Sequence, residues 1–234
     1  MSADEHHPDQ RYARLPADEA EAVAMQAELA SCVVVADPAG AVETVAGLDI
    51  AYDKDGDDVV ATAVVLRRGD LEVLDQAVVR GRSDFPYVPG LLAFRELPML
   101  LRAVESLKVT PDVFVCDGYG LAHPRRFGLA CHLGVVLDVP SIGVAKSPPH
   151  VSVAEPGTRR GDWSPIHSGE EVIGCALRTR EEVKPIYVSV GHRCTLDTAR
   201  ELVLELAPDY RLPEPIRAAD HLGRRRLAAA EEAR

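Results

Sequence analysis

The sequence predicts an α/β protein built on a mixed sheet, in which three antiparallel strands precede parallel strand–helix–strand units and helices cover both faces. Two patterns support this. Three strand-like runs separated by short turns come early in the chain, and short, continuously apolar runs alternate with helix-like segments later. Continuously apolar runs are typical of strands that are buried on both faces, as parallel strands joined by helices require. The 234 residues, 47% of them hydrophobic, can bury a core of this size.

The first half of the chain supplies one helix and the antiparallel strands. Residues 1–16 are expected to form a flexible acidic leader, and strong helix formers then predict a helix over 17–31. Three strand-like runs separated by the turn-rich KDGDD and RRGD follow, at residues 45–53, 59–68 and 71–81. Their spacing indicates an antiparallel meander. The segment SDFPYVPG at 83–90 has two prolines and a glycine and is expected to be a constrained loop.

Helices and buried strands alternate in the second half. The expected elements are a helix at 97–108 with Pro98 in its first turn, a strand at 111–118, a helix at 125–138 and a strand at 140–146. A Pro/Gly/Ser-rich surface excursion at 147–169, paired strands at 171–179 and 184–191, a helix at 195–206 capped by Thr195, and a basic C-terminal helix follow. This order is the layout of the ribonuclease H-like fold. Residues 17–234 are expected to form a single domain.

Composition and charge exclude several classes of protein. No apolar run approaches the roughly 18 to 20 residues that span a bilayer, and the acidic N-terminus lacks a signal-peptide pattern. Five cysteines without a CxxC pair argue against a disulfide framework and a four-cysteine zinc site, and favour a reducing cytosol. The net charge is −11, but residues 1–43 hold nine acids and only two bases, whereas 80–126 and 211–234 hold more bases than acids. The net charge therefore does not exclude a polyanionic partner. We also expect the protein to be cytoplasmic and monomeric.

Four acidic residues stand where carboxylates are unusual. Asp49 lies inside a predicted strand that is at least half buried, where an unpaired carboxylate is costly. Asp117 ends a buried strand just before Gly118, at the end of the sheet where ligands gather in α/β proteins. Glu96 and Asp220 lie at or on predicted helices. Each has an ordinary explanation on its own: a paired Asp, an Asp-Gly turn, a charge at a helix N-terminus, or a solvated helix face.

The order of these acids along the fold favours a metal-dependent nuclease. One carboxylate in the first strand, one near the first helix, one ending the fourth strand and one on a late helix is the arrangement by which ribonuclease H-like nucleases bind two divalent ions. Mg²⁺ prefers oxygen ligands, and two ions can hold the attacking and leaving oxygens of a phosphodiester. Without a metal, converging carboxylates would repel one another.

Five motifs make the prediction more specific. They are VAGLDIAYD at 45–53, PYVPGLLAFRELP at 86–98, DGYGLAHPRRFGLACHLG at 117–134, PSIGVAKS at 140–147 and LPEPIRAADHL at 212–222. Together they closely resemble the endonuclease V family, the deoxyinosine 3′-endonucleases, from Gly47 to Leu222. The departures are small: Tyr119 and Thr195 replace a polar amide and a Ser that are more usual, and Asp220 keeps an oxygen ligand where some relatives have His. The first 40 residues lie outside the resemblance.

The resemblance implies a role for each candidate site residue. Asp49 and Asp117 would be the principal Mg²⁺ ligands, and Glu96 and Asp220 would complete the acidic cluster, with Mn²⁺ expected to substitute. Lys146 would orient or activate the attacking water or steady the phosphate charge. Tyr87 would be a wedge that stacks into the gap left by an everted base. The base pocket would be lined by Gly90, Leu92, Gly118, Gly120, Gly128 and Leu129, its loop organised by His123, and phosphates would be contacted by Arg125 and Arg126.

The activity that the resemblance implies is that of a Mg²⁺-dependent DNA repair endonuclease specific for deoxyinosine. It would hydrolyse the second phosphodiester bond 3′ to the lesion and leave a 3′-hydroxyl and a 5′-phosphate. A family member that acts mainly on inosine in single-stranded RNA would carry the same motifs, so that alternative stays open. A lesion-binding repair factor that does not cut is a second alternative, disfavoured because all four acids are present. A junction resolvase or an RNA-strand-specific enzyme on the same fold would lack the PYVPG and DGxGxAHPRR segments.

Overall fold

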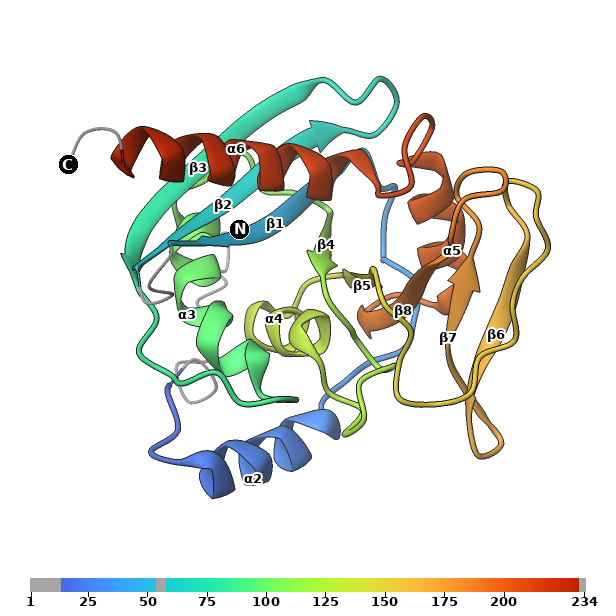
Figure 1. The fold of residues 1–234 in the computed structure, drawn as a ribbon, viewed down its shortest axis with the longest axis horizontal. Coiled ribbons are helices and arrows are strands. Elements are labelled where there is room, and N and C mark those ends of the chain that lie inside the picture. The colour runs from blue at the N-terminus through green and yellow to red at the C-terminus, as the bar shows by residue number, and fades with distance from the viewer. Residues whose placement is uncertain (1–13, 54–57, 232–234) are drawn as a thin grey trace, which may run out of the picture.

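Eight strands form one mixed sheet in this computed structural model, which describes residues 14–53 and 58–231 (Figure 1). The strand order is β3-β2-β1-β4-β5-β8-β7-β6. The strands are β1 (Thr44–Tyr52), β2 (Asp58–Arg67), β3 (Val73–Arg82), β4 (Val113–Asp117), β5 (Ser141–Ala145), β6 (Trp163–Ser168), β7 (Glu171–Leu177) and β8 (Ile186–His192). Most of the predicted leader lies outside the described residues.

The pairing of the strands confirms the predicted mixed sheet. β1, β2 and β3 form the antiparallel meander, and β4 and β5 then pair in parallel on the other side of β1. β8 runs antiparallel to β5, and β7 and β6 continue the sheet in antiparallel fashion. The predicted pair at 171–179 and 184–191 is thus confirmed as β7 and β8. The predicted surface excursion at 147–169 contains one further strand, β6, which pairs with β7.

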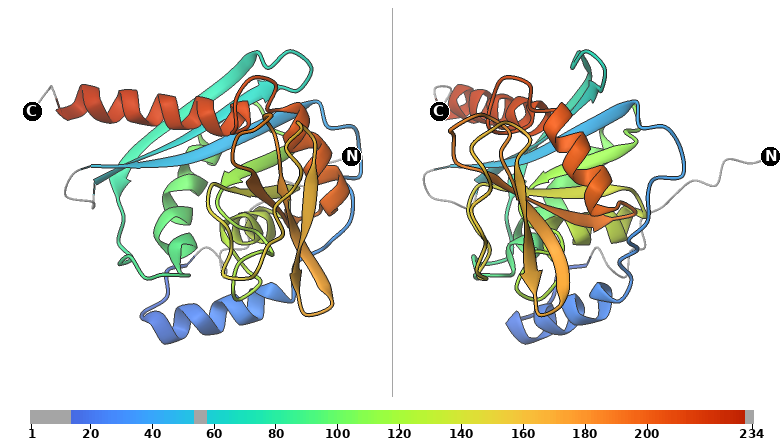
Figure 2. Two further views of the ribbon diagram at one scale, coloured as in Figure 1. Left: turned by 45° about the vertical axis from the view of Figure 1, so that its right-hand side comes forward. Right: turned by 90° about the vertical axis from the view of Figure 1, so that its right-hand side faces the viewer.

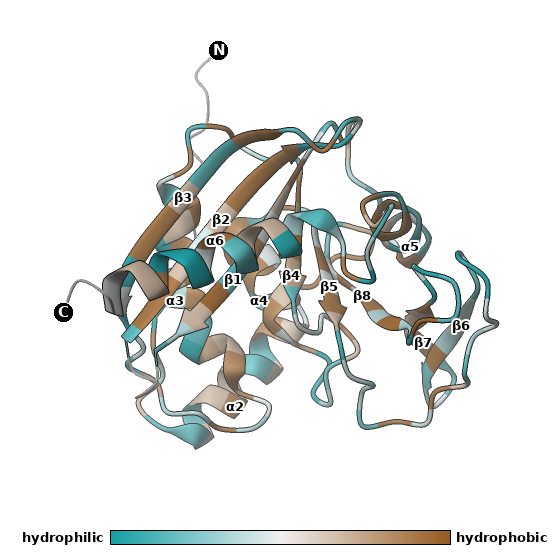
Figure 3. Cartoon of the chain, turned by 45° about the horizontal axis from the view of Figure 1, so that its top comes forward, coloured by the Kyte–Doolittle hydropathy of each residue, from teal (hydrophilic) through white to brown (hydrophobic). Residues whose placement is uncertain are grey.

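Helices cover both faces of the sheet, as predicted. α3 (Leu92–Glu105) and α4 (Leu129–Leu137) pack on one face, and α5 (Leu196–Glu205) and α6 (Glu214–Glu231) pack on the other. Side chains of β1 alternate between the two: Ala46 and Leu48 contact the α3–α4 layer, whereas Val45 packs with Ile216 of α6. Figure 3 shows β1 and β2 as mainly hydrophobic ribbons beneath a more polar α6.

The first helix, α2 (Glu19–Ala30), forms an additional layer outside α4 and away from the sheet (Figure 2). Asp18 caps it, because its side chain accepts a hydrogen bond from the Glu21 amide at 2.8 Å. The predicted Thr195 cap of α5 is likewise present, with the Thr198 amide donating to its hydroxyl. None of the helices among the described residues is long and apolar enough to cross a membrane.

Two predicted helix boundaries are wrong. α3 begins at Leu92, five residues before the predicted start at 97, so Pro98 lies inside the helix and Glu96 in its second turn. Burial of Ala93, Phe94 and Leu97 against neighbouring side chains outweighs the missing proline N–H. The next helix begins at 129 rather than 125.

The late start of α4 has a backbone cause. Arg126 has a φ of 60°, in the left-handed region, which a right-handed helix cannot include. Gly128 is the N-cap in an extended conformation, and a Cβ there would lie 2.1 Å from the Tyr119 carbonyl oxygen. Residues 123–128 therefore form a tight loop, and Arg125 and Arg126 do not open the helix.

The start of α6 is held tightly against the sheet. A Cβ on Gly47 would lie 2.0 Å from the carbonyl carbon and oxygen of Pro215, so only glycine allows this approach. One turn later, the buried Thr62 hydroxyl donates to the Ala219 carbonyl at 2.9 Å. These two contacts fix α6 across β1 and β2, and with it the position of Asp220.

Candidate functional site

The register of two parallel strands brings two aspartates together. Leu48 of β1 pairs with Cys116 of β4, and the next residue on each strand is an aspartate, Asp49 and Asp117. Neighbouring parallel strands lie about 4.8 Å apart, so the two carboxylates share one end of the sheet. Both are partly buried.

The other two predicted acids reach the same place from helices. Glu96 comes from α3 on one face and Asp220 from α6 on the other. Together with Lys146, which follows β5 directly, all four acids line one cavity of about 520 Å³. The structure therefore brings together all five residues that the sequence analysis assigned to catalysis.

Carboxyl groups are concentrated in this acidic cavity, and their proximity and burial raise the pKa of two of them. Burial first, and then the nearby carboxylates of Asp117 and Asp220, raise the pKa of Asp49 to about 7. Burial is also the main cause that raises the pKa of Glu96 to about 8, and the charges of Asp49 and Asp117 add to it. The Tyr52 hydroxyl opposes this shift by donating a hydrogen bond to Glu96 Oε1 at 3.0 Å.

Basic side chains contact the other two acids. Lys146 Nζ lies 2.5 Å from Asp117 Oδ2, and Arg224 Nε donates to Asp220 Oδ1 at 2.8 Å. Among the described residues, no three His, Cys, Asp or Glu side chains lie close enough together, as they stand, to hold one ion. The donor chemistry nevertheless fits a hard divalent cation, because four carboxylates from separate elements face one cavity and two of them have strongly raised pKa values.

A second cavity, of about 320 Å³, adjoins the first. Leu92 and Leu129 line both cavities, so the two share a wall. The rest of the second lining includes the predicted pocket residues Tyr87, Gly90, Gly118, His123, Arg125 and Gly128. Tyr87 is 70% exposed, so its ring is not folded onto the core.

Two of the loops around this second cavity have fixed conformations. Gly90 has a φ of +80°, and a Cβ there would lie 2.8 Å from Arg125 Nη2. His123 is buried and accepts a hydrogen bond from the Arg125 amide through Nδ1, so it organises its loop as predicted. Burial and then the Arg125 charge lower the pKa of His123 to about 4, which keeps its ring neutral at physiological pH.

Two predicted substrate-binding residues do not line the cavity. Gly120 is buried behind the wall, where its amide donates to Ser189 Oγ at 2.9 Å and a Cβ would meet the Val190 carbonyl oxygen at 2.0 Å. Arg126, which was predicted to contact phosphate, does not line the cavity and forms an ion pair with Glu171 of β7. Gly120 is required because its backbone packs closely against that of Val190, and Arg126 joins its loop to β7.

Several residues of the two cavities were missed by the sequence analysis. Arg224 is one helical turn after Asp220, a spacing that could have revealed the pair. Gln26 follows Ala22 and Met25 and precedes Leu29 on the buried face of α2, where a polar side chain is unusual. Tyr52 offered no comparable signal, because its contact with Glu96 depends on the tertiary fold.

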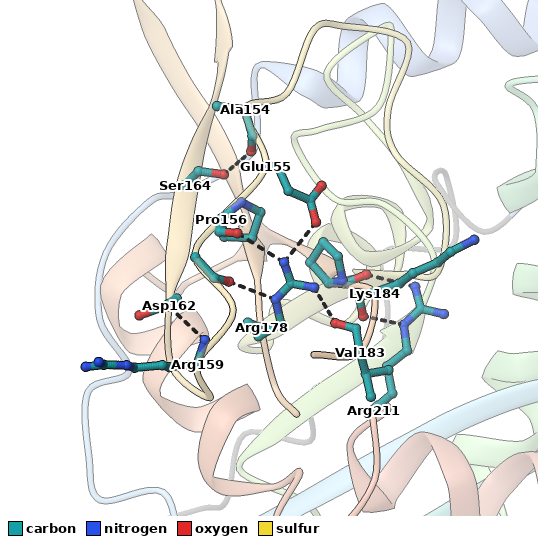
Figure 4. Close-up of polar contacts among 12 residues, drawn as sticks. Ala154, Glu155, Pro156, Arg159, Asp162, Ser164, Arg178, Val183, Lys184 and Arg211 are labelled. Atoms are coloured by element: carbon teal, nitrogen blue, oxygen red, sulfur yellow. Dashed lines mark hydrogen bonds and ion pairs between the residues drawn. The ribbon is translucent and has the colours of Figure 1, made fainter. Parts of the chain in front are cut away.

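Arg211 holds the segment that carries Lys146. Its Nη2 donates to the Lys146 carbonyl at 2.7 Å and to the Pro185 carbonyl at 2.8 Å, and its Nε donates to the Lys184 carbonyl at 2.9 Å. Beside it, the buried Arg178 ties Glu155, Pro156 and Val183 together (Figure 4). The end of β5 is thus anchored to the entry of β8.

The sheet order and the acid-lined cavity define this chain as a ribonuclease H-like α/β protein with a carboxylate site. The family model for Endonuclease V matches residues 27–221, starting within α2 and thus before Gly47. The chain belongs to the Endonuclease V family and is therefore an endonuclease.

Individual relatives agree with this assignment. The Endonuclease V of Nocardia farcinica is 56% identical over 218 residues, which cover 92% of this chain and 96% of that protein. The crystal structure of Endonuclease V from Streptomyces avermitilis has a TM-score of 0.88 at 51% identity and covers 94% of this chain and 97% of that one. An Endonuclease V of Ciona intestinalis, in complex with a 23mer DNA containing an inosine followed by a ribo-adenosine, has a TM-score of 0.82 at 32% identity and covers 90% of this chain and 97% of that one.

Proposed function

We propose that the chain is a Mg²⁺-dependent repair endonuclease that recognises deoxyinosine in DNA and hydrolyses the second phosphodiester bond 3′ to it, leaving a 3′-hydroxyl and a 5′-phosphate. The observation that carries this proposal is the shared wall of the two cavities. Asp117 lines the acidic cavity, and the next residue, Gly118, lines the second one. A base held in the second cavity would thus place its own strand beside the carboxylates.

The acidic cavity supplies the chemistry. Divalent ions held by Asp49, Asp117, Glu96 and Asp220 would activate water and stabilise the leaving oxygen, with Mn²⁺ able to replace Mg²⁺. Lys146, now paired with Asp117, is 44% exposed and placed to steady the charge of the phosphate. Arg224 at the rim adds a second positive group, since its side chain is 74% exposed.

The second cavity supplies recognition. Its lining is largely apolar with a few polar groups, which suits a flat heterocyclic base. Gly90, Gly118 and Gly128 present no side chain to the cavity, so a base can approach the backbone closely, and Tyr87 at the rim can stack into the gap that the everted base leaves. The inosine-containing DNA bound to the Ciona intestinalis relative supports this assignment.

The proposal is tested by cleavage of matched oligonucleotides. A duplex with a single deoxyinosine, the same duplex with adenine, and a single-stranded RNA with one inosine are incubated with the enzyme and Mg²⁺, and the product ends are mapped. We expect nicking of the inosine duplex at the second bond 3′ to the lesion. Faster cleavage of the RNA would favour the RNA-specific alternative, and binding without any cleavage would favour a lesion-binding factor.

A further inference from the structure

Gln26 is a buried polar residue on α2, only 1% exposed, and it lines the second cavity. Its side chain joins the two loops that form the cavity walls. Nε2 donates to the Gly90 carbonyl and to the Phe127 carbonyl, both at 3.1 Å, and Oε1 accepts from Arg125 Nε at 2.6 Å. The partners lie 64 to 101 residues away in sequence, so no local element holds them together.

The chemistry of this contact set is specific to glutamine. Two carbonyl oxygens need donors and one guanidinium needs an acceptor, and a single amide group satisfies all three. A glutamate would keep the contact to Arg125 but would turn an oxygen toward the two carbonyls. An apolar side chain would leave all three partners without this contact in a buried position, which is costly.

The contacted groups define the geometry of the cavity. Gly90 ends the PYVPG loop that carries Tyr87, and its carbonyl also accepts from Arg125 Nη2 at 2.5 Å. Phe127 precedes Gly128, the N-cap of α4, whose amide bonds back to the Gly120 carbonyl. Gln26 therefore spans the distance between the wedge loop and the loop at 123–128.

We propose that Gln26 is a positioning residue that sets the separation of the two cavity walls and thereby the enzyme's selectivity for the lesion base. This inference rests on the proposed function, since it concerns how the same pocket reads its substrate. It makes α2 part of the recognition apparatus, although α2 contributes nothing to the acidic cavity.

The test compares Gln26→Glu and Gln26→Met with the unchanged enzyme. Single-turnover cleavage is measured over a range of enzyme concentrations on the inosine duplex and on the matched adenine duplex, at a temperature below every melting transition. For both variants we expect the half-saturating enzyme concentration on the inosine duplex to rise about tenfold. The rate at saturation should change little, because the carboxylates and Lys146 are untouched.

The control separates positioning from mere stability. Leu202→Ala removes a buried side chain of α5, which packs in the core cluster on the opposite face of the sheet. It should lower the melting temperature without changing the half-saturating concentration. Gln26 variants that melt lower but keep the inosine preference and half-saturation of the unchanged enzyme would overturn the inference. An unchanged enzyme with no preference for inosine would instead overturn the proposed function, which the same experiment distinguishes.

Discussion

Lys146 Nζ contacts Asp117 Oδ2 at 2.5 Å, and this pair joins the ends of two adjacent parallel strands, β5 and β4. The carbonyl of the same lysine accepts a hydrogen bond from Arg211, which lies just before α6. The position of the lysine therefore depends on an arginine 65 residues away. This arrangement allows the role of Lys146 to be tested without changing Lys146.

We expect Arg211→Ala to lower the saturated nicking rate about tenfold while leaving the half-saturating concentration nearly unchanged. The side chain anchors three backbone carbonyls around Lys146 but lines neither cavity. The matched control is Arg160→Ala, which removes an arginine that donates to the Leu204 and Ala207 carbonyls at the end of α5. An equal loss of rate in both variants would show that Arg211 acts through general stability alone.

Tyr87→Ala should weaken binding to the inosine duplex by about 1 to 3 kcal/mol of base stacking, which is a factor of about 5 to 150. Tyr87→Phe should keep most of the affinity, because stacking needs the ring rather than the hydroxyl. The 70% exposure of Tyr87 predicts little change in melting temperature for either variant. Binding titrations on duplexes with and without inosine measure the effect, and unchanged lesion discrimination in Tyr87→Ala would remove the wedge from the account.

Gly90→Ala should impair inosine recognition and lower stability by about 1 to 2 kcal/mol, because alanine is unfavourable in the left-handed region. The new Cβ would also press on Arg125 Nη2 at 2.8 Å and disturb the wall of the second cavity. Gly69→Ala is the control, since a Cβ there meets nothing within 4 Å. Melting temperature and inosine binding should both fall only in Gly90→Ala; a normal affinity would contradict the assigned position of this loop.

His123 should make the protein less stable in acid. Its pKa is about 4 in the folded protein against 6.5 ordinarily, so the unfolded chain binds the proton more tightly. The stability that the neutral ring contributes is complete above about pH 6.5 and is lost as the pH falls toward 4, by about 2 kcal/mol between pH 7 and pH 5. His123→Gln, which can still accept from the Arg125 amide, should lose less over this interval. Denaturant unfolding at both pH values measures the difference, and parallel losses would refute the assignment.

The fold was largely predictable because strands and buried carboxylates leave local signals. Alternating turn and apolar runs predicted β1 to β5, and an aspartate that ends an apolar run, as Asp117 does, is visible in the sequence. The starts of α3 and α4 could not be predicted. Packing of α3 outweighs the proline at 98, and the left-handed backbone of residue 126 delays the start of α4. The contacts of Gln26 and Arg211 could not be predicted either, since their partners are brought close only by the folded sheet.

We propose that the acidic cavity cuts nucleic acid through divalent ions held by Asp49 and Asp117. The most direct test is nicking of a deoxyinosine duplex by the unchanged enzyme, with Mg²⁺ or with EDTA, beside Asp49→Asn and Asp117→Asn. We predict nicking only by the unchanged enzyme with Mg²⁺, and a melting temperature for Asp49→Asn that is not lowered, because its buried carboxylate has a pKa raised to about 7. Appreciable cleavage by either variant, or full activity in EDTA, would show that the reaction does not depend on divalent ions held by Asp49 and Asp117.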